Sequence, residues 1–379
     1  MSFFYRLVFC FFLLNATVYV HAEDGSTRTV LIGFAGPLSE PGVLSAKNAA
    51  LLAVEEANKS TIRINGQAVT FKLIAENDRA DQRTAAFIAH YFANTHVVGV
   101  VGHLSSDAAL AASPIYAEAE IPEIAPIAWL KKYTQQNFRT SFQMVGDDAL
   151  ALRNTADYLI NDVKMKNFLV IDDGAQLGSS MADHFVDAVK SSNGNIIERI
   201  SVSNKTSDFN VPLQEAIQKK PELIFFSGRV IQSKALLNEM IWQHRAVDVL
   251  ITGIPLTDSF FENIKGMDNR LLAIVVGAPF EKMSGVKSLK KKYYAKFGNE
   301  MLPFSAFSYD SVNVLIAAIK KADSLEQNKI VDALHAIEYD GVTGKISFNE
   351  NGALSQPVST LYELKNRRWE VVKIFKNKN

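Results

Sequence analysis

Residues 97–116 read VVGVVGHLSSDAALAASPIY. An apolar, β-branched run leads into Gly102 and His103, and two serines and an aspartate then open an alanine-rich segment. The pattern predicts a buried strand, a tight turn and a helix. Such a turn points unpaired backbone N–H groups and the positive end of the helix dipole at whatever lies in front of it. Three partners are possible for these N–H groups: a nucleotide phosphate, a small carboxylate, or only the serine that caps the helix.

The same alternation extends along the chain in both directions. Buried strands are predicted at residues 29–36, 69–77, 97–103, 122–128, 167–172, 195–202, 222–228 and 247–253. Helices are predicted at residues 43–58, 81–94, 106–119, 147–162, 177–191, 207–219 and 231–243. Strands that alternate with helices of this length indicate parallel sheets covered on both faces. The pattern restarts after Gly146, which predicts an α/β fold of two doubly wound lobes.

The last third of the chain does not build a third domain. A strand at residues 271–280 and helices at 284–297 and 304–321 precede strands at 344–354, 359–366 and 369–375. We expect these elements to complete the two existing lobes, so the chain crosses between them more than once. In such folds the ligand lies beyond the carboxyl ends of the strands, here in the gap between the lobes.

The N-terminus has the pattern of an export signal. Arg6 precedes a short apolar run, and small residues end at Ala22 before an acidic pair. The run is short for a transmembrane helix, which makes an uncleaved anchor the less favoured alternative. The only cysteine, Cys10, lies inside this segment after the bulky Phe9, so neither lipidation nor a disulfide is expected.

Charge and motifs exclude several classes of function. The charges of the 40 basic and 40 acidic residues cancel, so the chain has no excess positive charge with which to bind nucleic acid or an anionic membrane. Gly99 and Gly102 lack the third glycine and the spacing of a dinucleotide fingerprint, and no P-loop lysine follows. The chain has no G-x-S-x-G elbow, and its seven histidines form no H-x-x-x-H pair. The sequence therefore favours binding over catalysis, with no cofactor and no metal.

Side chains at predicted strand and helix ends are candidates for this binding role. Ser105 or Ser106 caps the helix at 106–119, and the other hydroxyl is free to meet a small carboxylate. Each charge-assisted hydrogen bond would then contribute about 1.5–3 kcal/mol. The acidic pair at 147–148 is better explained as an N-cap with a first-turn charge than as an acid–base pair.

The chain resembles the periplasmic solute-binding proteins of ABC transporters, specifically the branched-chain amino acid type. The resemblance covers essentially the whole mature chain. It is carried by VLIGFAGPLSEPG, AENDRADQRTAA, VVGVVGHLSSDAALAASPIYAEAEIPEIAP, TSDFNVPLQEAIQKKPELIFFSG, FSYDSVNVLIAAI and YDGVTGKISFNENGAL, in the family's order. The resemblance implies the type I periplasmic binding protein fold, two Rossmann-like lobes joined by three hinge crossings that close on a ligand.

The resemblance also implies ligand-binding positions. The serine that takes a ligand carboxylate falls on Ser106, with Ser105 before it. A backbone carbonyl and a threonine of the family fall on Ile127 and Trp129, and an aromatic residue falls on Phe304.

Other positions depart from the family pattern. The first-loop tyrosine falls on Pro41, and two tyrosines of the second lobe fall on Leu177 and Arg229. The acid that neutralises an α-amino group falls on or next to Pro255. An ammonium ion would then lack a counter-charge, which costs several kcal/mol when buried. The sequence therefore argues against leucine, isoleucine or valine as the ligand.

The substitutions instead favour an anionic or aromatic small molecule. Trp129 offers a flat apolar surface, although a place in the core is an equally good interpretation. Arg229 offers a planar cation for a carboxylate, although it can also reach solvent or an acid between the lobes.

Together these features predict a monomeric periplasmic receptor, not an enzyme, that presents its ligand to a membrane permease. A sensing subunit that docks a membrane receptor or kinase is the alternative. The expected organisation is a signal peptide at 1–22, a first lobe at 23–145 plus 279–350, and a second lobe at 146–278 plus 351–379.

Overall fold

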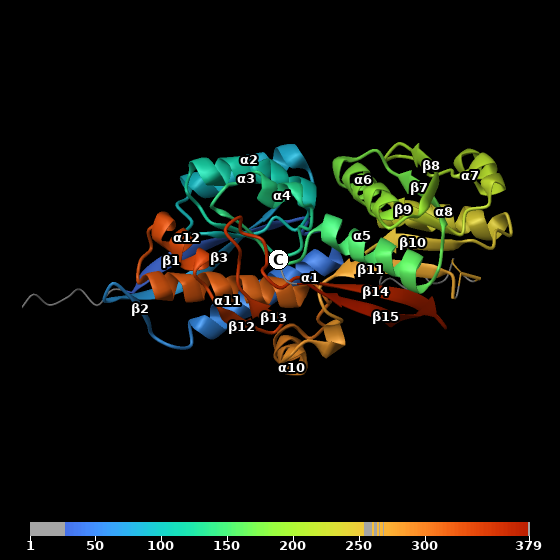
Figure 1. The fold of residues 1–379 in the computed structure, drawn as a ribbon. Coiled ribbons are helices and arrows are strands. Elements are labelled where there is room, and N and C mark those ends of the chain that lie inside the picture. The colour runs from blue at the N-terminus through green and yellow to red at the C-terminus, as the bar shows by residue number, and fades with distance from the viewer. Residues whose placement is uncertain (1–26, 254–259, 261–263, 265, 268, 378–379) are drawn as a thin grey trace, which may run out of the picture.

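The computed structural model describes residues 27–253, 260, 264, 266–267 and 269–377. The predicted signal segment at 1–22 and Pro255 lie outside these residues. Figure 1 shows two sheet-centred bodies side by side. We call the body around the six-stranded sheet the first lobe and the body around the seven-stranded sheet the second lobe.

The six-stranded sheet has the order β2-β3-β1-β4-β5-β6. Its strands are β1 (Arg28–Gly36), β2 (Ile62–Ile64), β3 (Gln67–Asn77), β4 (Val100–Val101), β5 (Glu123–Ala125) and β6 (Ser141–Gln143). All neighbours are parallel except β2, which forms an antiparallel hairpin with β3. The parallel arrangement confirms the sheet type that the sequence predicts for this lobe.

The seven-stranded sheet has the order β15-β14-β11-β10-β9-β7-β8. Its strands are β7 (Asn167–Asp172), β8 (Asn195–Ser201), β9 (Leu223–Ser227), β10 (Asp248–Thr252), β11 (Leu271–Val276), β14 (Val358–Lys365) and β15 (Arg368–Lys376). The last two strands join antiparallel at the edge formed by β11. A small hairpin pairs β12 (Tyr339–Gly341) with β13 (Gly344–Ile346).

Helices cover both faces of the first sheet. One face packs against α1 (Pro41–Ala57), α11 (Ser305–Ala322) and α12 (Gln327–His335). The other face packs against α2 (Gln82–Asn94) and α3 (Ser106–Glu118). The short α4 (Lys132–Gln135) lies near α3, and α10 (Val286–Phe297) packs near α1 after the 3₁₀ turn η3 (Phe280–Lys282). The late helices α10 to α12 thus complete the first lobe.

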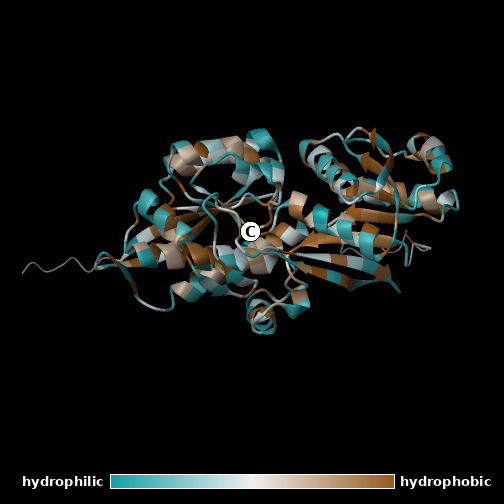
Figure 2. Cartoon of the chain, viewed as in Figure 1, coloured by the Kyte–Doolittle hydropathy of each residue, from teal (hydrophilic) through white to brown (hydrophobic). Residues whose placement is uncertain are grey.

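The second sheet is covered in the same way. Helix α5 (Asp148–Asp157) and helix α6 (Gln176–Ser191) lie on one face. On the other face lie α7 (Asn210–Ala216), continued by η2 (Ile217–Lys219), and α8 (Val230–Trp242). Figure 2 shows the apolar strands between helices whose outer sides are hydrophilic. Burial on both faces explains why the parallel strands read as continuous apolar runs.

The structure also corrects several predicted boundaries. The strand expected at 97–103 is hydrogen-bonded as a strand only at Val100–Val101. The helix expected at 147–162 ends as a π-helix, η1 (Tyr158–Asp162). The strand expected at 344–354 stops at Ile346, because the chain then forms turns and an isolated bridge between Phe348 and Leu354. Helix α12 and strands β2, β6 and β12 were not predicted.

Candidate functional site

A cleft of about 790 Å³ lies between the lobes. The first lobe lines it with residues that follow β1, β3, β4 and β5, and the second lobe with residues that follow β7, β8, β9 and β10. The cleft therefore sits at the carboxyl ends of both sets of parallel strands, where ligands bind in open α/β folds.

The serine turn forms one wall of this cleft. Ser105 is the N-cap of α3, and its Oγ accepts a hydrogen bond from the Ala108 N–H at 3.4 Å. Ser106 is 3% exposed, and its Oγ accepts the Trp129 N–H at 3.1 Å. A hydroxyl that accepts one hydrogen bond still carries a donor hydrogen. Ser106 can therefore both fix the segment after β5 and donate to a ligand.

A buried polar network holds the turn in place. His103 Nδ1 lies 2.6 Å from Asp78 Oδ2, and its Nε2 lies 3.2 Å from the Tyr116 hydroxyl. All three side chains are fully buried. Asp78 Oδ1 also accepts the Ala80 N–H at 2.8 Å. The loop after β3 and the turn after β4 are thereby linked behind the cleft.

Apolar side chains from both lobes line part of the cleft. Trp129 reaches it from the segment after β5, and Leu177 and Met181 reach it from α6. Ile231, 71% exposed, reaches it from α8. These side chains can cover the apolar body of a bound molecule.

Two arginines line the cleft as well. Arg229 precedes α8 as its N-cap, and its guanidinium donates to the Asn204 carbonyl. The Arg229 N–H is accepted by Gln232 Oε1 at 3.3 Å, which fixes the start of the helix. Arg79, from the loop after β3, faces the same space but was not a predicted ligand-binding residue.

Three carboxyl groups in the cleft were likewise not predicted as ligand-binding residues. Burial raises the pKa of Asp107, and the charge of Asp173 raises it further. Burial also raises the pKa of Asp173, although its Oδ1 accepts the Ala175 N–H at 3.0 Å. Burial and the charge of Asp78 raise the pKa of Glu40. The position of Asp107, directly after the two serines, was the sequence signal available.

The predicted ligand-binding residues fall into three groups. The structure brings five of them together around the cleft: Ser105, Ser106, Trp129, Leu177 and Arg229. Ile127 is not among the lining residues, and its side chain packs against apolar clusters of the first lobe. The predicted contact through its backbone carbonyl stays a prediction. Phe304 lines a separate cavity of about 70 Å³ near β11. Pro255 lies outside the described residues, so its role stays a prediction.

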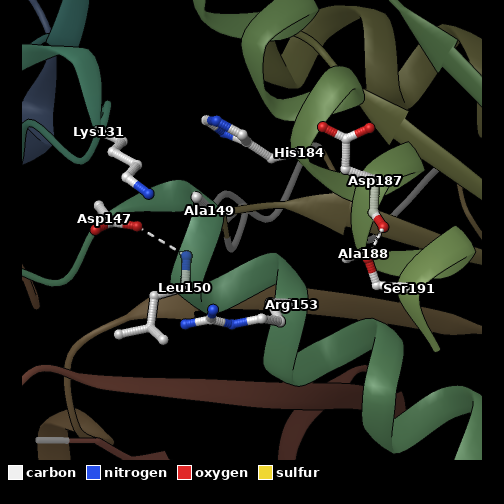
Figure 3. Close-up of a pocket in the computed structure, with 9 residues that line it drawn as sticks. All are labelled: Lys131, Asp147, Ala149, Leu150, Arg153, His184, Asp187, Ala188 and Ser191. Atoms are coloured by element: carbon white, nitrogen blue, oxygen red, sulfur yellow. Dashed lines mark hydrogen bonds between the residues drawn. The ribbon is translucent and has the colours of Figure 1, made fainter. Parts of the chain in front are cut away.

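A second cavity of about 280 Å³ lies where α5 and α6 meet the segment after β5 (Figure 3). Asp147 caps α5 by accepting the Leu150 N–H at 2.8 Å, which confirms the predicted N-cap. The buried Asp148 accepts the Lys131 N–H at 2.9 Å and lies 2.9 Å from His184 Nδ1. Asp148 therefore joins the segment after β5 to helices α5 and α6.

Within the described residues, no group of three or more His, Cys, Asp or Glu side chains is placed to hold a metal ion. No helix in the described part of the chain has the length and apolar character needed to cross a membrane.

The sequence model of one protein family, described as "Periplasmic binding protein", matches residues 29–368. The chain belongs to the periplasmic binding protein family. A similar curated protein is the leucine-, isoleucine-, valine-, threonine- and alanine-binding protein of Pseudomonas aeruginosa, 24% identical over 88% of this chain and 90% of that protein. Another is Leu/Ile/Val-binding protein homolog 1 of Brucella abortus, 24% identical over 94% of each chain.

Solved structures of this family have the same fold. The branched-chain amino acid transporter substrate-binding protein LivJ of Streptococcus pneumoniae, in complex with isoleucine, aligns with a TM-score of 0.79 at 21% identity, over 93% of this chain and all of that one. A solute-binding protein of R. palustris, in complex with benzoate, aligns with a TM-score of 0.77 at 16% identity, over 93% of this chain and 98% of that one.

These matches confirm the predicted fold class and family. The chain has the type I periplasmic binding protein fold, with two doubly wound α/β lobes. Proteins of this family are exported to the periplasm, bind small ligands and deliver them to ABC transporter permeases. The relatives and structural neighbours are substrate-binding proteins rather than enzymes.

Proposed function

We propose that this periplasmic binding protein captures a small organic solute in the 790 Å³ cleft and presents the closed form to the permease of an ABC transporter. The observation that carries the proposal is the convergence of polar and apolar side chains from both lobes on one cleft. Because such a solute contacts both lobes, its binding energy shifts the equilibrium from the open to the closed form. No observation favours the sensing alternative.

The same proposal includes the processing, the oligomeric state and the lobe boundaries of the mature protein. The signal segment is removed after Ala22, and the mature protein acts as a monomer. Residues 23–145 with 279–350 move as one lobe, and residues 146–278 with 351–379 move as the other. The order of the strands in the two sheets supports this division.

The lining of the cleft suggests an anionic group on the solute. Arg229 faces the cleft with a planar cation that can bind a carboxylate through two hydrogen bonds. Trp129 and Leu177 face an aromatic or extended apolar body from opposite lobes. A protein with the same fold binds benzoate, so the fold accommodates an aromatic carboxylate.

Mass spectrometry of the gently purified mature protein tests the proposal. We expect a small organic molecule that stays bound under native conditions and is released on unfolding. Arg229→Met should weaken the binding of that molecule about tenfold or more, because a charge-assisted hydrogen bond is lost. Arg63→Met is the matched control, since the exposed Arg63 also donates to a backbone carbonyl, that of Gly66, but lies on β2. Equal affinity in both variants would contradict the role of Arg229.

A further inference from the structure

A buried polar cluster of Glu123, Ser141 and Gln143 lies in the first lobe, at strands β5 and β6. The two strands run parallel, and Glu123 on β5 is the register partner of Ser141 on β6. Gln143 follows Ser141 by two residues, so the three side chains share one face of the sheet. All three residues are fully buried. In such a place each polar atom normally has a hydrogen-bond partner.

Three oxygen atoms of this polar cluster lack such a partner. Glu123 Oε2, Ser141 Oγ and Gln143 Oε1 form no hydrogen bond within the described part of the chain. The side-chain nitrogen of Gln143 donates to the Ala128 carbonyl at 2.8 Å, so the Gln143 side-chain oxygen can only accept. The Oε2 atom of an ionised Glu123 can also only accept. The Ser141 hydroxyl hydrogen alone cannot satisfy both acceptors, so the cluster is one donor short.

The surroundings of Glu123 contain no paired cation. No ion pair in the described residues involves this side chain. Its titratable neighbours are Tyr133 on α4, Tyr116 on α3, and the His103 ring, which is paired with Asp78. Burial raises the pKa of Glu123 well above its ordinary value, and the Tyr133 hydroxyl and the His103 N–H lower it only in part. A buried site without a cation favours the neutral form of a carboxyl group.

The other oxygen of Glu123 holds the serine turn, residues 102–106. Glu123 Oε1 accepts the His103 N–H at 3.3 Å, and His103 lies two residues before the Ser105 N-cap of α3. The adjacent Gly102 N–H donates to the Ile124 carbonyl at 3.0 Å. Strand β5 thus fixes the turn at two successive N–H groups, once through its backbone and once through the Glu123 side chain.

We propose that Glu123 is a positioning residue of the cleft, a neutral carboxylic acid that holds the serine turn with Oε1 and carries its proton on Oε2. The proton supplies the donor that the polar cluster lacks, and it removes a negative charge from the interior of the first lobe. Because Ser105 and Ser106 lie on this turn and line the cleft, the neutral acid keeps their hydroxyls in place. The inference rests on the proposed function, in which this turn takes part in solute capture.

Urea unfolding of the ligand-free protein between pH 4 and pH 8 tests the protonation state. Glu123→Gln replaces the neutral acid by an amide of the same shape that has no proton to lose. Because the folded pKa of Glu123 lies above the unfolded value of about 4.3, the wild type loses stability as pH rises between these two values. The stability of Glu123→Gln relative to the wild type should therefore grow with pH, by up to about tenfold in the folding equilibrium constant per pH unit.

Glu118→Gln is the matched control, because Glu118 is exposed at the end of α3 and meets water in both the folded and the unfolded chain. Its small effect on stability should be the same at both ends of the pH range. A constant gap between Glu123→Gln and the wild type would overturn the inference, since Glu123 would then be ionised in the folded protein. A wild type that is stabilised when sodium replaces choline at constant ionic strength, beside an unresponsive Glu123→Gln, would also overturn it, because a bound cation would then neutralise Glu123.

Hydrogen exchange of the ligand-free protein, followed by mass spectrometry at pH 7, tests the positioning role. Glu123→Leu removes the acceptor of the His103 N–H and should speed exchange at residues 102–108 about tenfold or more. Glu123→Gln keeps an oxygen at that place and should retain the slow exchange of the wild type. Strand β1 of the same sheet serves as the internal reference, and its exchange should not change.

Two results of this exchange experiment would contradict a positioning role. Equal exchange at residues 102–108 in Glu123→Leu and the wild type would show that Glu123 does not hold the turn. Equally accelerated exchange in β1 would show that Glu123 stabilises the whole lobe instead of the turn. Neither the unfolding nor the exchange experiment uses a solute, so their failure leaves the proposed function standing, and a failure to recover any solute leaves their results unchanged.

Discussion

At Gly102 the chain leaves β4 and enters the serine turn with φ at 150°. A Cβ at this position would lie 2.5 Å from the Ala35 carbonyl oxygen and 2.9 Å from its nitrogen. We expect Gly102→Ala to lower the free energy of unfolding by about 3 kcal/mol or more, since backbone atoms cannot yield as a flexible side chain does. Urea unfolding of the purified variant measures this change.

Gly66→Ala is the matched control for that substitution. Gly66 also has a positive φ, of 79°, but a Cβ there would meet nothing within 4 Å. Gly66→Ala should therefore lower the free energy of unfolding by only about 1 kcal/mol, which is the strain of a positive φ alone. Equal losses of unfolding free energy in the two variants would show that the close approach to Ala35 is not what requires glycine at position 102.

Single residues also show what the sequence could reveal of the site. Ser105 and Ser106 were found because they follow an apolar strand and open a helix, a local pattern. Trp129, Leu177 and Arg229 were found only by resemblance. Asp107 and Asp173 were missed as cleft residues because only the folded chain shows that both line the space between the lobes. That relation depends on how two lobes are placed, which no local pattern encodes.

At the level of helices and strands, the periodicity and length of the apolar patterns were sufficient to predict most elements of the fold. Fully buried strands such as β9 read as apolar runs, and helices such as α6 show one buried face. The missed elements are short or late in the chain. Strands β2 and β6 have three residues each, and α12 follows α11 after only a brief turn. The apolar pattern in each of these segments is too short to be distinguished from the sequence of a loop.

The contact between α5 and α6 predicts a dependence on pH. The hydrogen bond that the His184 ring donates to the Asp148 carboxylate raises the pKa of His184 in the folded protein, against a smaller opposing effect of burial. A raised folded-state pKa stabilises the fold fully below the unfolded histidine pKa of about 6.5, and the stabilisation is lost as pH rises through the folded value. The stability gap between the wild type and His184→Gln should therefore be larger at pH 5 than at pH 9, as measured by urea unfolding.

The exposed His90 on α2 provides the comparison for this prediction. No carboxylate is paired with it among the described residues. His90→Gln should therefore change stability by a similar small amount at both pH values. A gap for His184→Gln that grows with pH would show that the contact with Asp148 does not favour the protonated ring.

At the scale of the whole molecule, the two lobes have separate apolar cores and share a cleft. The chain passes between them after β6, after β11 and before β14, so short segments connect two well-packed bodies. Residues 23–379 contain no cysteine, which means that packing, not disulfides, holds each lobe. Under the proposed function, we expect motion to be concentrated in the connecting segments and to be controlled by a ligand that touches both lobes.

Energy transfer between dyes on the two lobes tests this closure directly. The side chains of Phe87 on α2 and Trp242 on α8 are 74% and 76% exposed, so cysteines can replace them at little cost to the fold. With no other cysteine in residues 23–379, both dyes attach at known sites. We expect the co-purified solute to raise the transfer efficiency in wild-type background, and Arg229→Met to require about tenfold more solute for the same change. An efficiency that stays constant at saturating solute would mean that binding occurs without closure, and the cleft would then act as a rigid pocket.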